Sequence, residues 1–398
     1  MIARKNLREI VNEIWDVLII GAGPAGSSAA ITLAENNFRV LLIDKENFPR
    51  EKVCGDGLIG DAQKVLERFG VLDAVLDKGY RVAKLSVFSP SRHEIVLSVP
   101  AITIQRKKLD NIILKKAVEL GAYFYSSKIV DVSEKSNFVE VTDAEQNIYK
   151  AKYVLIATGA DLSLLKSASA SSVKTRNTIA LRSYYKSASK LDRLIVTYDK
   201  LIMPGYGWIF PMGEGIYNIG CGVFGESLND KKINLKELFE KFLKEFPLAK
   251  ELVSKGERID EIKGARLRCG LKCENAVINN RILVIGETIS TTFNYTGEGI
   301  GKAMESGIIA GELVGRSLRE NSNVHLEYPN ILMQKYSGLF NGYRIAQKWL
   351  SNKLLTDFMI KRTRESDYLK NSITSVLNND ENPAKVFSIG GLLKSYIK

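Results

Sequence analysis

The apolar positions near the start of the chain predict two short buried strands with a helix between them. A largely apolar run at residues 15–20 predicts the first strand, and small and apolar residues at 27–36 predict the helix. A second apolar run at 39–43 predicts the next strand, which ends on Asp44. This order of strand, helix and strand is typical of a βαβ unit in an α/β fold with a parallel sheet.

Later apolar runs have the same character, at residues 153–157 and 281–285, and a helical pattern from about residue 297 to 319 follows the second run. Between them the pattern changes, because strand-like runs at 81–104 and an aromatic, strand-rich stretch at 178–225 are typical of an antiparallel sheet. The chain therefore combines two kinds of sheet.

We predict an α/β protein with a discontinuous Rossmann-like nucleotide-binding domain, an inserted antiparallel-sheet substrate lobe and a helical C-terminal region. The expected boundaries are 1–80, 101–177 and 275–325 for the nucleotide-binding domain, 81–100 and 178–274 for the lobe, and 326–398 for the helical region.

The turn after the first strand reads GAGPAG at residues 21–26 and predicts dinucleotide binding. Gly21 allows a tight turn, Gly23 lets the backbone approach a pyrophosphate, and Gly26 lets the helix pack on the strand. The pyrophosphate is expected on the free N–H groups at the helix N-terminus, beside Pro24 and Ala25. A ribose hydroxyl is expected at Asp44. Lys45 follows directly.

Composition excludes several other classes. The chain has 398 residues, 45% hydrophobic positions and a net charge of +12. The charge is compatible with an anionic membrane surface, but no segment resembles a nucleic-acid-binding module and no apolar run is long enough to span a bilayer. Four scattered cysteines and only two histidines make a metal site unlikely to form, so we expect none. We expect a cytoplasmic protein with reduced thiols.

Six separated segments together resemble one family of flavoproteins. The first four are GAGPAG, Arg106 in QRKKLD, ATG at 157–159, and GETISTTFNYTGEGIGKAMESG at 286–307, in the order found in the p-hydroxybenzoate hydroxylase fold. The segments EKVCGDG at 51–57 and GYGWIFP at 205–211 resemble those of the geranylgeranyl reductases. The resemblance implies a bound FAD and the saturation of isolated double bonds in prenyl chains.

The resemblance also implies which residues hold FAD, with the first βαβ unit at its ADP half and the C-terminal segment at its flavin half. Beyond the first βαβ unit these residues are Lys52, Cys54, Gly55, Asp56, Gly57, Arg106, Thr158, Gly159, Gly286, Glu287, Gly297, Gly299 and Ile300. Arg106 is expected to pair bidentately with phosphate oxygens or to remain a solvated charge at a helix start. Glu287 departs from the family's usual Asp, and Asn294 stands near where the family usually has Pro, so the contacts there stay open.

Two features are candidates for contact with the substrate. Cys54 lies in a glycine loop that the resemblance places at the active site; a basic neighbour such as Lys52 would lower the pKa of its thiol and make it a proton donor, whereas a buried structural thiol is the alternative. Tyr206, Trp208 and Phe210 alternate along a strand that ends at Pro211, so they face an apolar substrate or pack the core.

Our main hypothesis is an FAD-dependent oxidoreductase that transfers hydride to carbon–carbon double bonds of a long apolar, prenyl-type substrate. The alternative in the same fold is a monooxygenase or halogenase that uses oxygen and a C4a-hydroperoxyflavin, and a lipid-recognising flavoprotein without catalysis is a third. No second glycine fingerprint follows a strand, so we expect NAD(P)H or a ferredoxin-type protein as a transient reductant. The basic C-terminal region, with Trp349, Leu354 and Phe358 among Lys and Arg residues, either contacts a membrane surface or packs on its own domain.

Overall fold

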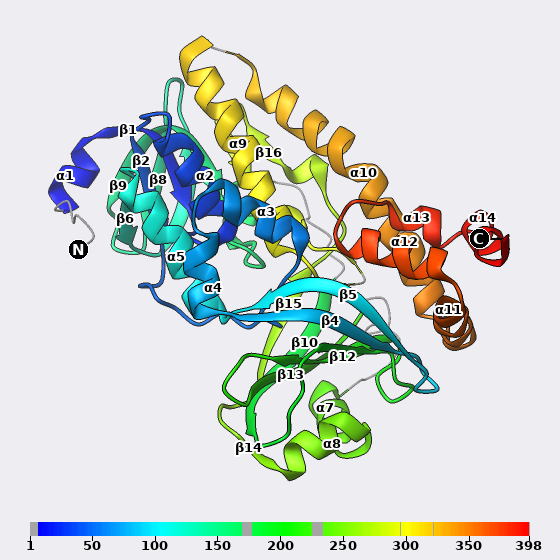
Figure 1. Cartoon of the computed structure of the whole chain (residues 1–398). Coiled ribbons are helices and arrows are strands. Elements are labelled where there is room, and N and C mark those ends of the chain that lie inside the picture. Colours follow the sequence, from blue (N-terminus) through cyan, green and yellow to red (C-terminus); the bar gives the residue numbers. More distant parts are fainter. Residues whose placement is uncertain (1–6, 169–176, 225–233, 295, 321, 398) are drawn as a thin grey trace.

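A computed structural model describes the whole chain except residues 1–6, 169–176, 225–233, 295, 321 and 398 (Figure 1). It contains two sheets, and a group of helices from the C-terminal part of the chain lies along one side of both (Figure 1). The α/β class, the second antiparallel sheet and the helical C-terminal region are as the sequence predicted.

The first sheet has eight strands in the described residues, and five of them run parallel in the order β17-β9-β1-β2-β6. β16 and the hairpin β7–β8 extend it antiparallel. Ile20 and Ile43 are paired at the ends of β1 and β2, so the residues that follow both strands meet at one edge. The strands are β1 (Ile14–Ile20), β2 (Val40–Asp44), β6 (Tyr123–Ser126), β7 (Ile129–Glu134), β8 (Val139–Asp143), β9 (Ile148–Ile156), β16 (Val277–Asn279) and β17 (Ile282–Val284).

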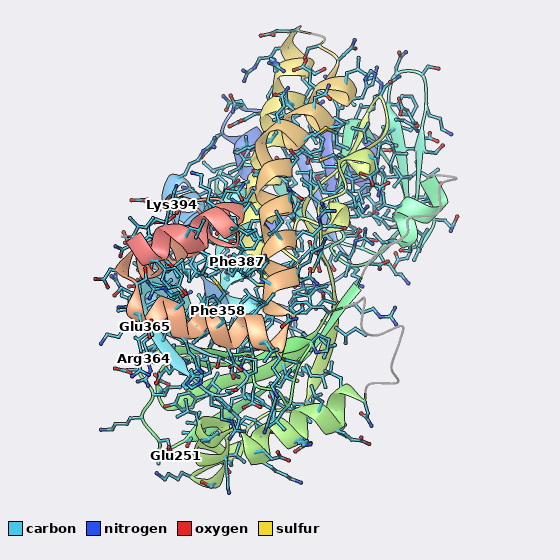
Figure 2. All side chains as sticks on the ribbon, turned by 90° about the vertical axis from the view of Figure 1, so that its right-hand side faces the viewer. Glu251, Phe358, Arg364, Glu365, Phe387 and Lys394 are labelled. Carbon is cyan, nitrogen blue, oxygen red and sulfur yellow. The ribbon has the colours of Figure 1, made fainter. Side chains whose placement is uncertain are left out.

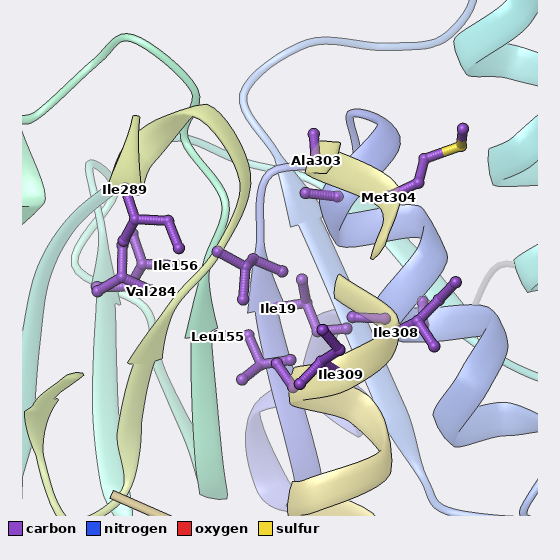
Figure 3. Close-up of a cluster of buried hydrophobic side chains, with 14 of the residues drawn as sticks. Ile19, Leu155, Ile156, Val284, Ile289, Ala303, Met304, Ile308 and Ile309 are labelled. Atoms are coloured by element: carbon purple, nitrogen blue, oxygen red, sulfur yellow. The ribbon is translucent and has the colours of Figure 1, made fainter. Parts of the chain in front are cut away.

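A buried apolar core fixes this sheet to helix α9 (Figure 3). Ile19 and Leu155 from β1 and β9 are fully buried, and Ile308 and Ile309 of α9 belong to the same cluster. This core holds the start of α9 close to the turn that follows β1. The helices of this part are α1 (Leu7–Asn12), α2 (Pro24–Ala34), α3 (Gly60–Arg68), α4 (Leu72–Lys78), α5 (Arg106–Glu119), α6 (Ser163–Ala168) and α9 (Ile300–Glu320), with short 3-10 helices η2 (Cys273–Asn275) and η3 (Gly286–Ile289).

The second sheet has nine strands in the described part of the chain and is mostly antiparallel, apart from the parallel pair β4–β11. Its order is β14-β10-β13-β12-β11-β4-β5-β3, with β15 also paired to β10. The strands are β3 (Gly57–Leu58), β4 (Tyr80–Phe88), β5 (Glu94–Thr103), β10 (Asn177–Ser187), β11 (Leu194–Thr197), β12 (Gly205–Pro211), β13 (Ile216–Val223), β14 (Gly256–Arg258) and β15 (Lys263–Arg268).

The two faces of this second sheet have different roles. On β12 and β13, Ile209 and Ile219 are fully buried and pack with Phe239 and Phe242 below the sheet. These phenylalanines lie on α7 (Leu235–Glu245), which is followed by α8 (Pro247–Ser254). Because side chains alternate along a strand, the even-numbered positions of β12 face the opposite side. That side is turned toward the first sheet and the C-terminal helices (Figure 1).

The C-terminal helices pack on the first sheet through α10 and on the edge of the second sheet through α11 and α12. Ile360 of α11 joins Leu85 and Leu97 of β4 and β5 in a small apolar core. The helices are α10 (Val324–Leu350), α11 (Lys353–Glu365), α12 (Asp367–Leu377), α13 (Pro383–Val386) and α14 (Ile389–Ile397).

Some element boundaries differ from the sequence-based prediction. The helix expected at 62–77 is two helices, α3 and α4, because the chain turns at Gly70, which has φ +65°. The helix expected at 234–255 is divided at Pro247, since proline cannot continue the preceding helix. The first helix begins at Pro24 rather than at residue 27, so the glycine turn is shorter than expected. The domain boundaries stay a prediction.

Candidate functional site

One large cavity joins the glycine turn, the second sheet and the C-terminal helices. Its volume is about 690 Å³, within the range of pockets that hold cofactors and ligands. At one end it is lined by the ends of β1 and β2 and by the start of α9. At the other end it is lined by apolar residues of β4, β5, β11 and β12 and of the helices α10 to α13.

The glycine turn has the tight packing expected of a nucleotide-binding fingerprint. A Cβ on Gly21 would lie 2.3 Å from the Ala157 carbonyl oxygen, and a Cβ on Gly26 would lie 1.8 Å from the Gly21 carbonyl oxygen. A Cβ on Gly23 would meet within 4 Å only Nη2 of Arg50, at 3.4 Å, so this position faces the cavity. Gly26 is therefore a packing residue that does not line the cavity, and Gly23 leaves room for a ligand.

Asp44 closes this end of the cavity. Its carboxylate accepts hydrogen bonds from the Ala22 N–H at 2.8 Å and the Glu46 N–H at 3.0 Å, so it is held at the turn. Lys45, beside it, also lines the cavity, as do Pro24 and Ala25.

The ATG segment and the segment at 286–300 meet this turn from the other strands. Thr158, Gly159, Glu287, Gly297, Gly299 and Ile300 all line the cavity. A Cβ on Gly159 would lie 3.5 Å from Oε2 of Glu287 and 3.9 Å from Nζ of Lys52, so three separated segments converge there. Glu287 accepts a hydrogen bond from the Arg268 N–H at 3.2 Å. Gly286 does not line the cavity; its Cβ would lie 2.6 Å from that of Ala25, so it is a packing residue.

Arg106 is placed differently from the sequence-based expectation of a bidentate phosphate contact. It is buried, and its guanidinium makes a bidentate pair with Asp110, at 2.7 and 2.8 Å. Burial alone would lower the pKa of Arg106, but Asp110 outweighs that effect and raises it. Arg106 still lines the cavity and bonds the Cys54 thiol, so its bidentate partner is a side chain of its own helix.

Arg50 is a cation that the sequence analysis missed. Its Nη2 lies 3.2 Å from Oδ2 of Asp110 and is the nearest atom to the open side of Gly23. The side chain is 14% exposed and lines the cavity at the N-terminus of α2. Its position two residues before Lys52, in the same glycine loop, was the available signal.

The loop 54–57 lies beneath the aromatic strand. Burial raises the pKa of the Cys54 thiol, and the hydrogen bonds from Arg106 and from the Asp56 N–H offset this only in part. The predicted lowering of this pKa by Lys52 is therefore wrong, because burial of the thiol outweighs the neighbouring positive charge. Cys54 remains a protonated thiol at the cavity wall.

Asp56 is a buried carboxyl in the same loop. Its φ is +66°, and Oδ2 accepts hydrogen bonds from the Tyr184 hydroxyl and from Nδ2 of Asn218, the latter at 2.9 Å. Oδ1 is buried and has no hydrogen-bond partner among the described residues. Burial raises the pKa of Asp56 to about 6, although Tyr184, Asn218, Arg182 and Arg106 all favour the ionised form.

The aromatic side chains of β12 share one face, as predicted, and that face lines the cavity instead of packing the core. Tyr206 donates to the Thr296 carbonyl at 2.7 Å, and Nε1 of Trp208 donates to Oδ1 of Asn218 at 2.9 Å. A Cβ on Gly55 would lie 3.5 Å from the Phe210 ring, so the glycine loop and the strand are in close contact. Pro211, predicted with them, is not among the lining residues.

The apolar end of the cavity was not predicted. Its wall includes side chains from four C-terminal helices, together with Leu85, Val87, Ile95 and Val99 of β4 and β5. These helix residues include Tyr343, Ala346, Leu350, Met359, Ile360, Ile373, Val376 and Phe387. No charged side chain occurs among these residues, so this end suits a long apolar ligand.

Comparison with known proteins agrees with these features. The family described as pyridine nucleotide-disulphide oxidoreductase matches residues 15–209, and the geranylgeranyl reductase catalytic domain matches residues 191–264. The chain is 28% identical over 358 residues to a menaquinone reductase of Mycobacterium tuberculosis, covering 85% of this chain and 84% of the relative. It is 26% identical over 396 residues to a digeranylgeranylglycerophospholipid reductase of Methanococcus aeolicus, covering 93% and 96%.

Two solved structures share the fold over nearly the whole chain. A geranylgeranyl bacteriochlorophyll reductase-like protein of Thermoplasma acidophilum has a TM-score of 0.76 and 20% identity, covering 97% of this chain and 96% of that one. A flavin-dependent brominase has a TM-score of 0.78 and 19% identity, covering 97% and 98%. From the matched families and relatives, this chain belongs to the geranylgeranyl reductase family of FAD-dependent oxidoreductases.

Proposed function

We propose that this enzyme reduces carbon–carbon double bonds in a long apolar, prenyl-type substrate. The observation that carries the proposal is the cavity, which has a nucleotide-binding turn at one end and an apolar wall at the other. The names of the relatives support it, because menaquinone and digeranylgeranylglycerophospholipid both carry polyprenyl chains.

The residues present fit an FAD. Gly23 has an open side at the N-terminus of α2, and Arg50 lies beside it, so a pyrophosphate would find free N–H groups and a cation there. Asp44 and Lys45 would lie at the adenosine end, and Glu287 and Thr158 near the ribityl chain. Gly297, Gly299 and Ile300 would bring the N-terminus of α9 to the flavin. When bound and reduced, FAD would supply a hydride.

The chain's own residues would position the substrate against that flavin. Trp208 and Phe210 form an aromatic wall above the glycine loop, and Asn218 fixes the Trp208 ring through its indole N–H. The apolar residues of α10 to α13 would hold the rest of the chain out of water. Cys54 and Asp56 line the wall at the loop, where they would shape the surface next to the reacting bond.

The reductant and the membrane contact belong to the same proposal. Reducing equivalents would come from NAD(P)H or a ferredoxin-type protein that binds transiently. Helices α11 and α14 carry exposed apolar side chains among exposed basic ones, which would let them lie on an anionic membrane surface (Figure 2). The exposed apolar residues of these two helices are Leu354, Leu355, Phe358, Ile389, Leu393, Tyr396 and Ile397. In the described residues, no helix is both long and apolar enough to cross a bilayer.

Anaerobic reoxidation tests the proposed function. FAD-loaded protein is reduced with dithionite, freed of excess reductant and mixed without oxygen with menaquinol or with an unsaturated archaeal-type lipid in detergent. We expect reoxidation of the flavin and a product heavier by two hydrogens for each bond reduced, seen by mass spectrometry. No oxidation by any prenyl lipid, together with oxygen-dependent hydroxylation or halogenation of a substrate, would instead favour the oxygen-using alternative.

A further inference from the structure

Glu298 is a buried carboxyl at the cavity that the mechanism above does not use. It lies between Gly297 and Gly299, directly before α9, and lines the cavity. Its Oε2 is buried and has no hydrogen-bond partner among the described residues. Burial raises the pKa of Glu298 well above its ordinary value, and the nearby Asp61 adds to this effect.

The neighbouring cation is already paired with other carboxylates. Lys302 lies one turn further along α9, and its Nζ is 3.3 Å from Oδ2 of Asp61 and 2.9 Å from Oε1 of Glu305. Lys302 lowers the pKa of Glu298 only as the smallest of three effects. Glu298 is therefore a carboxylic acid that carries its proton at neutral pH.

The groups around Glu298 place it between the aromatic strand and the helical wall. It interacts electrostatically with the hydroxyls of Tyr206 on β12 and Tyr343 on α10, and with Asp61 and Lys302. Tyr206 and Tyr343 both line the cavity. A proton on Glu298 thus lies at the boundary between the flavin-binding segment and the apolar end.

The other two acidic groups at the cavity are less suited to donate a proton. Asp56 has a pKa raised to about 6 and is mostly ionised at neutral pH, and its Oδ1 is closed off from the cavity. Cys54 is protonated, but its thiol is a weak acid because burial raises its pKa further. A neutral carboxyl with cavity-facing surface has the stronger acidity of the two protonated groups.

We propose that Glu298 donates the proton that completes reduction of the double bond. This step rests on the proposed function. A hydride from reduced flavin forms a C–H bond to one alkene carbon, and the π electron pair forms the second C–H bond with the proton of Glu298. The Glu298 O–H bond breaks, the flavin is left oxidised, and the carboxylate regains its proton from solvent before the next turnover.

The test compares Glu298→Gln with wild type, Cys54→Ala and a surface control, Glu312→Gln, which removes an exposed carboxylate from the same helix. Each FAD-loaded protein is reduced and mixed anaerobically with the prenyl substrate across a pH series. We expect E298Q to slow flavin reoxidation at least 100-fold, the wild-type rate to fall as pH rises above neutral, and E298Q to lack that fall. Glu298→Asp should recover part of the rate.

A second measurement does not depend on turnover. The infrared difference spectrum of wild type minus E298Q should show the C=O stretch of a neutral carboxylic acid at neutral pH. Absence of this band, or an E298Q rate and pH profile equal to those of E312Q, overturns the proposal. Loss of activity in C54A but not in E298Q assigns the proton to Cys54 and also overturns it. If wild type itself is not oxidised by prenyl lipids while the band is present, the proposed function fails, and with it the step.

Discussion

Replacing Asp56 by Asn should stabilise the protein in a pH-dependent way. Asp56 is 1% exposed and lies in a loop whose other polar contacts are Tyr184, Asn218 and the positive charges of Arg182 and Arg106. Its pKa is raised from 3.8 to about 6 because burial disfavours the charged carboxylate. Asn keeps an oxygen acceptor in nearly the same volume but cannot ionise.

The sign follows from the direction of the shift. Below pH 4 the Asp56 carboxyl is neutral in both the folded and the unfolded chain, so it has no effect on the pH dependence. As pH rises from about 4 to about 6, the unfolded chain loses its proton first, and the folded state becomes relatively less stable. A shift of about 2 pKa units corresponds to about 3 kcal/mol of unfolding free energy, all of it lost above about pH 7.

The thermal midpoint of unfolding, measured at saturating FAD from pH 4.5 to 8, checks this prediction. With an unfolding entropy of about 2 cal/mol/K per residue, 3 kcal/mol in a chain of this length corresponds to about 3 to 4 °C. We expect the midpoint of D56N minus that of wild type to rise by about this amount between pH 4.5 and pH 7. Only this pH-dependent part counts, because lost contacts add a constant.

The control is Asp77→Asn, which removes one exposed carboxylate from α4 and reports the general effect of a changed net charge. A difference between D56N and wild type that stays constant across the pH series would refute the reasoning. The same result would show that the Asp56 side chain is ionised in the folded state with no penalty from burial.

Three further predictions concern cofactor and membrane binding. Gly26→Ala should lower stability by about 3 kcal/mol because its Cβ has no room, whereas Gly23→Ala should fold normally and weaken FAD binding, as thermal unfolding and flavin titration will show. Arg50→Gln should weaken FAD binding by about 10- to 100-fold by isothermal titration, unlike the exposed Lys64→Gln. Leu354→Ser combined with Phe358→Ser should reduce cosedimentation with phosphatidylglycerol vesicles, whereas Leu326→Ser, exposed on α10, should not.

The nucleotide-binding part of the fold was predictable because its signals are local. A glycine turn between a buried strand and a helix specifies both the backbone path and the side that stays open, and the structure has this geometry at Gly21, Gly23 and Gly26. The alternation of Tyr206, Trp208 and Phe210 likewise predicted a shared face. The sequence left open which side of the sheet that face would meet, because Ile209 on the opposite face is equally apolar.

Electrostatic properties were harder to predict because they depend on burial. Arg106 and Asp110 are four residues apart on a helix, so their pairing was visible in principle, but burial of the pair was not. For Cys54 the nearby cations were visible and the burial was not, and burial decides the direction of the pKa shift. The apolar wall was missed for a related reason, since the pattern of a C-terminal helix does not say which distant strands it covers.

Helix α11 connects the substrate cavity with the proposed membrane surface. Its buried side chains Met359, Ile360 and Thr363 line the cavity, while Leu354 and Phe358 are exposed on its other side. Lys361 and Arg364 are exposed along the same helix, and Lys394 is exposed on the adjacent α14 (Figure 2). A lipid leaving a bilayer at this face would therefore reach the apolar wall of the cavity by passing a single helix. A substrate with an apolar chain then need not cross water, whose contact would cost about 0.8 kcal/mol for each CH₂ group.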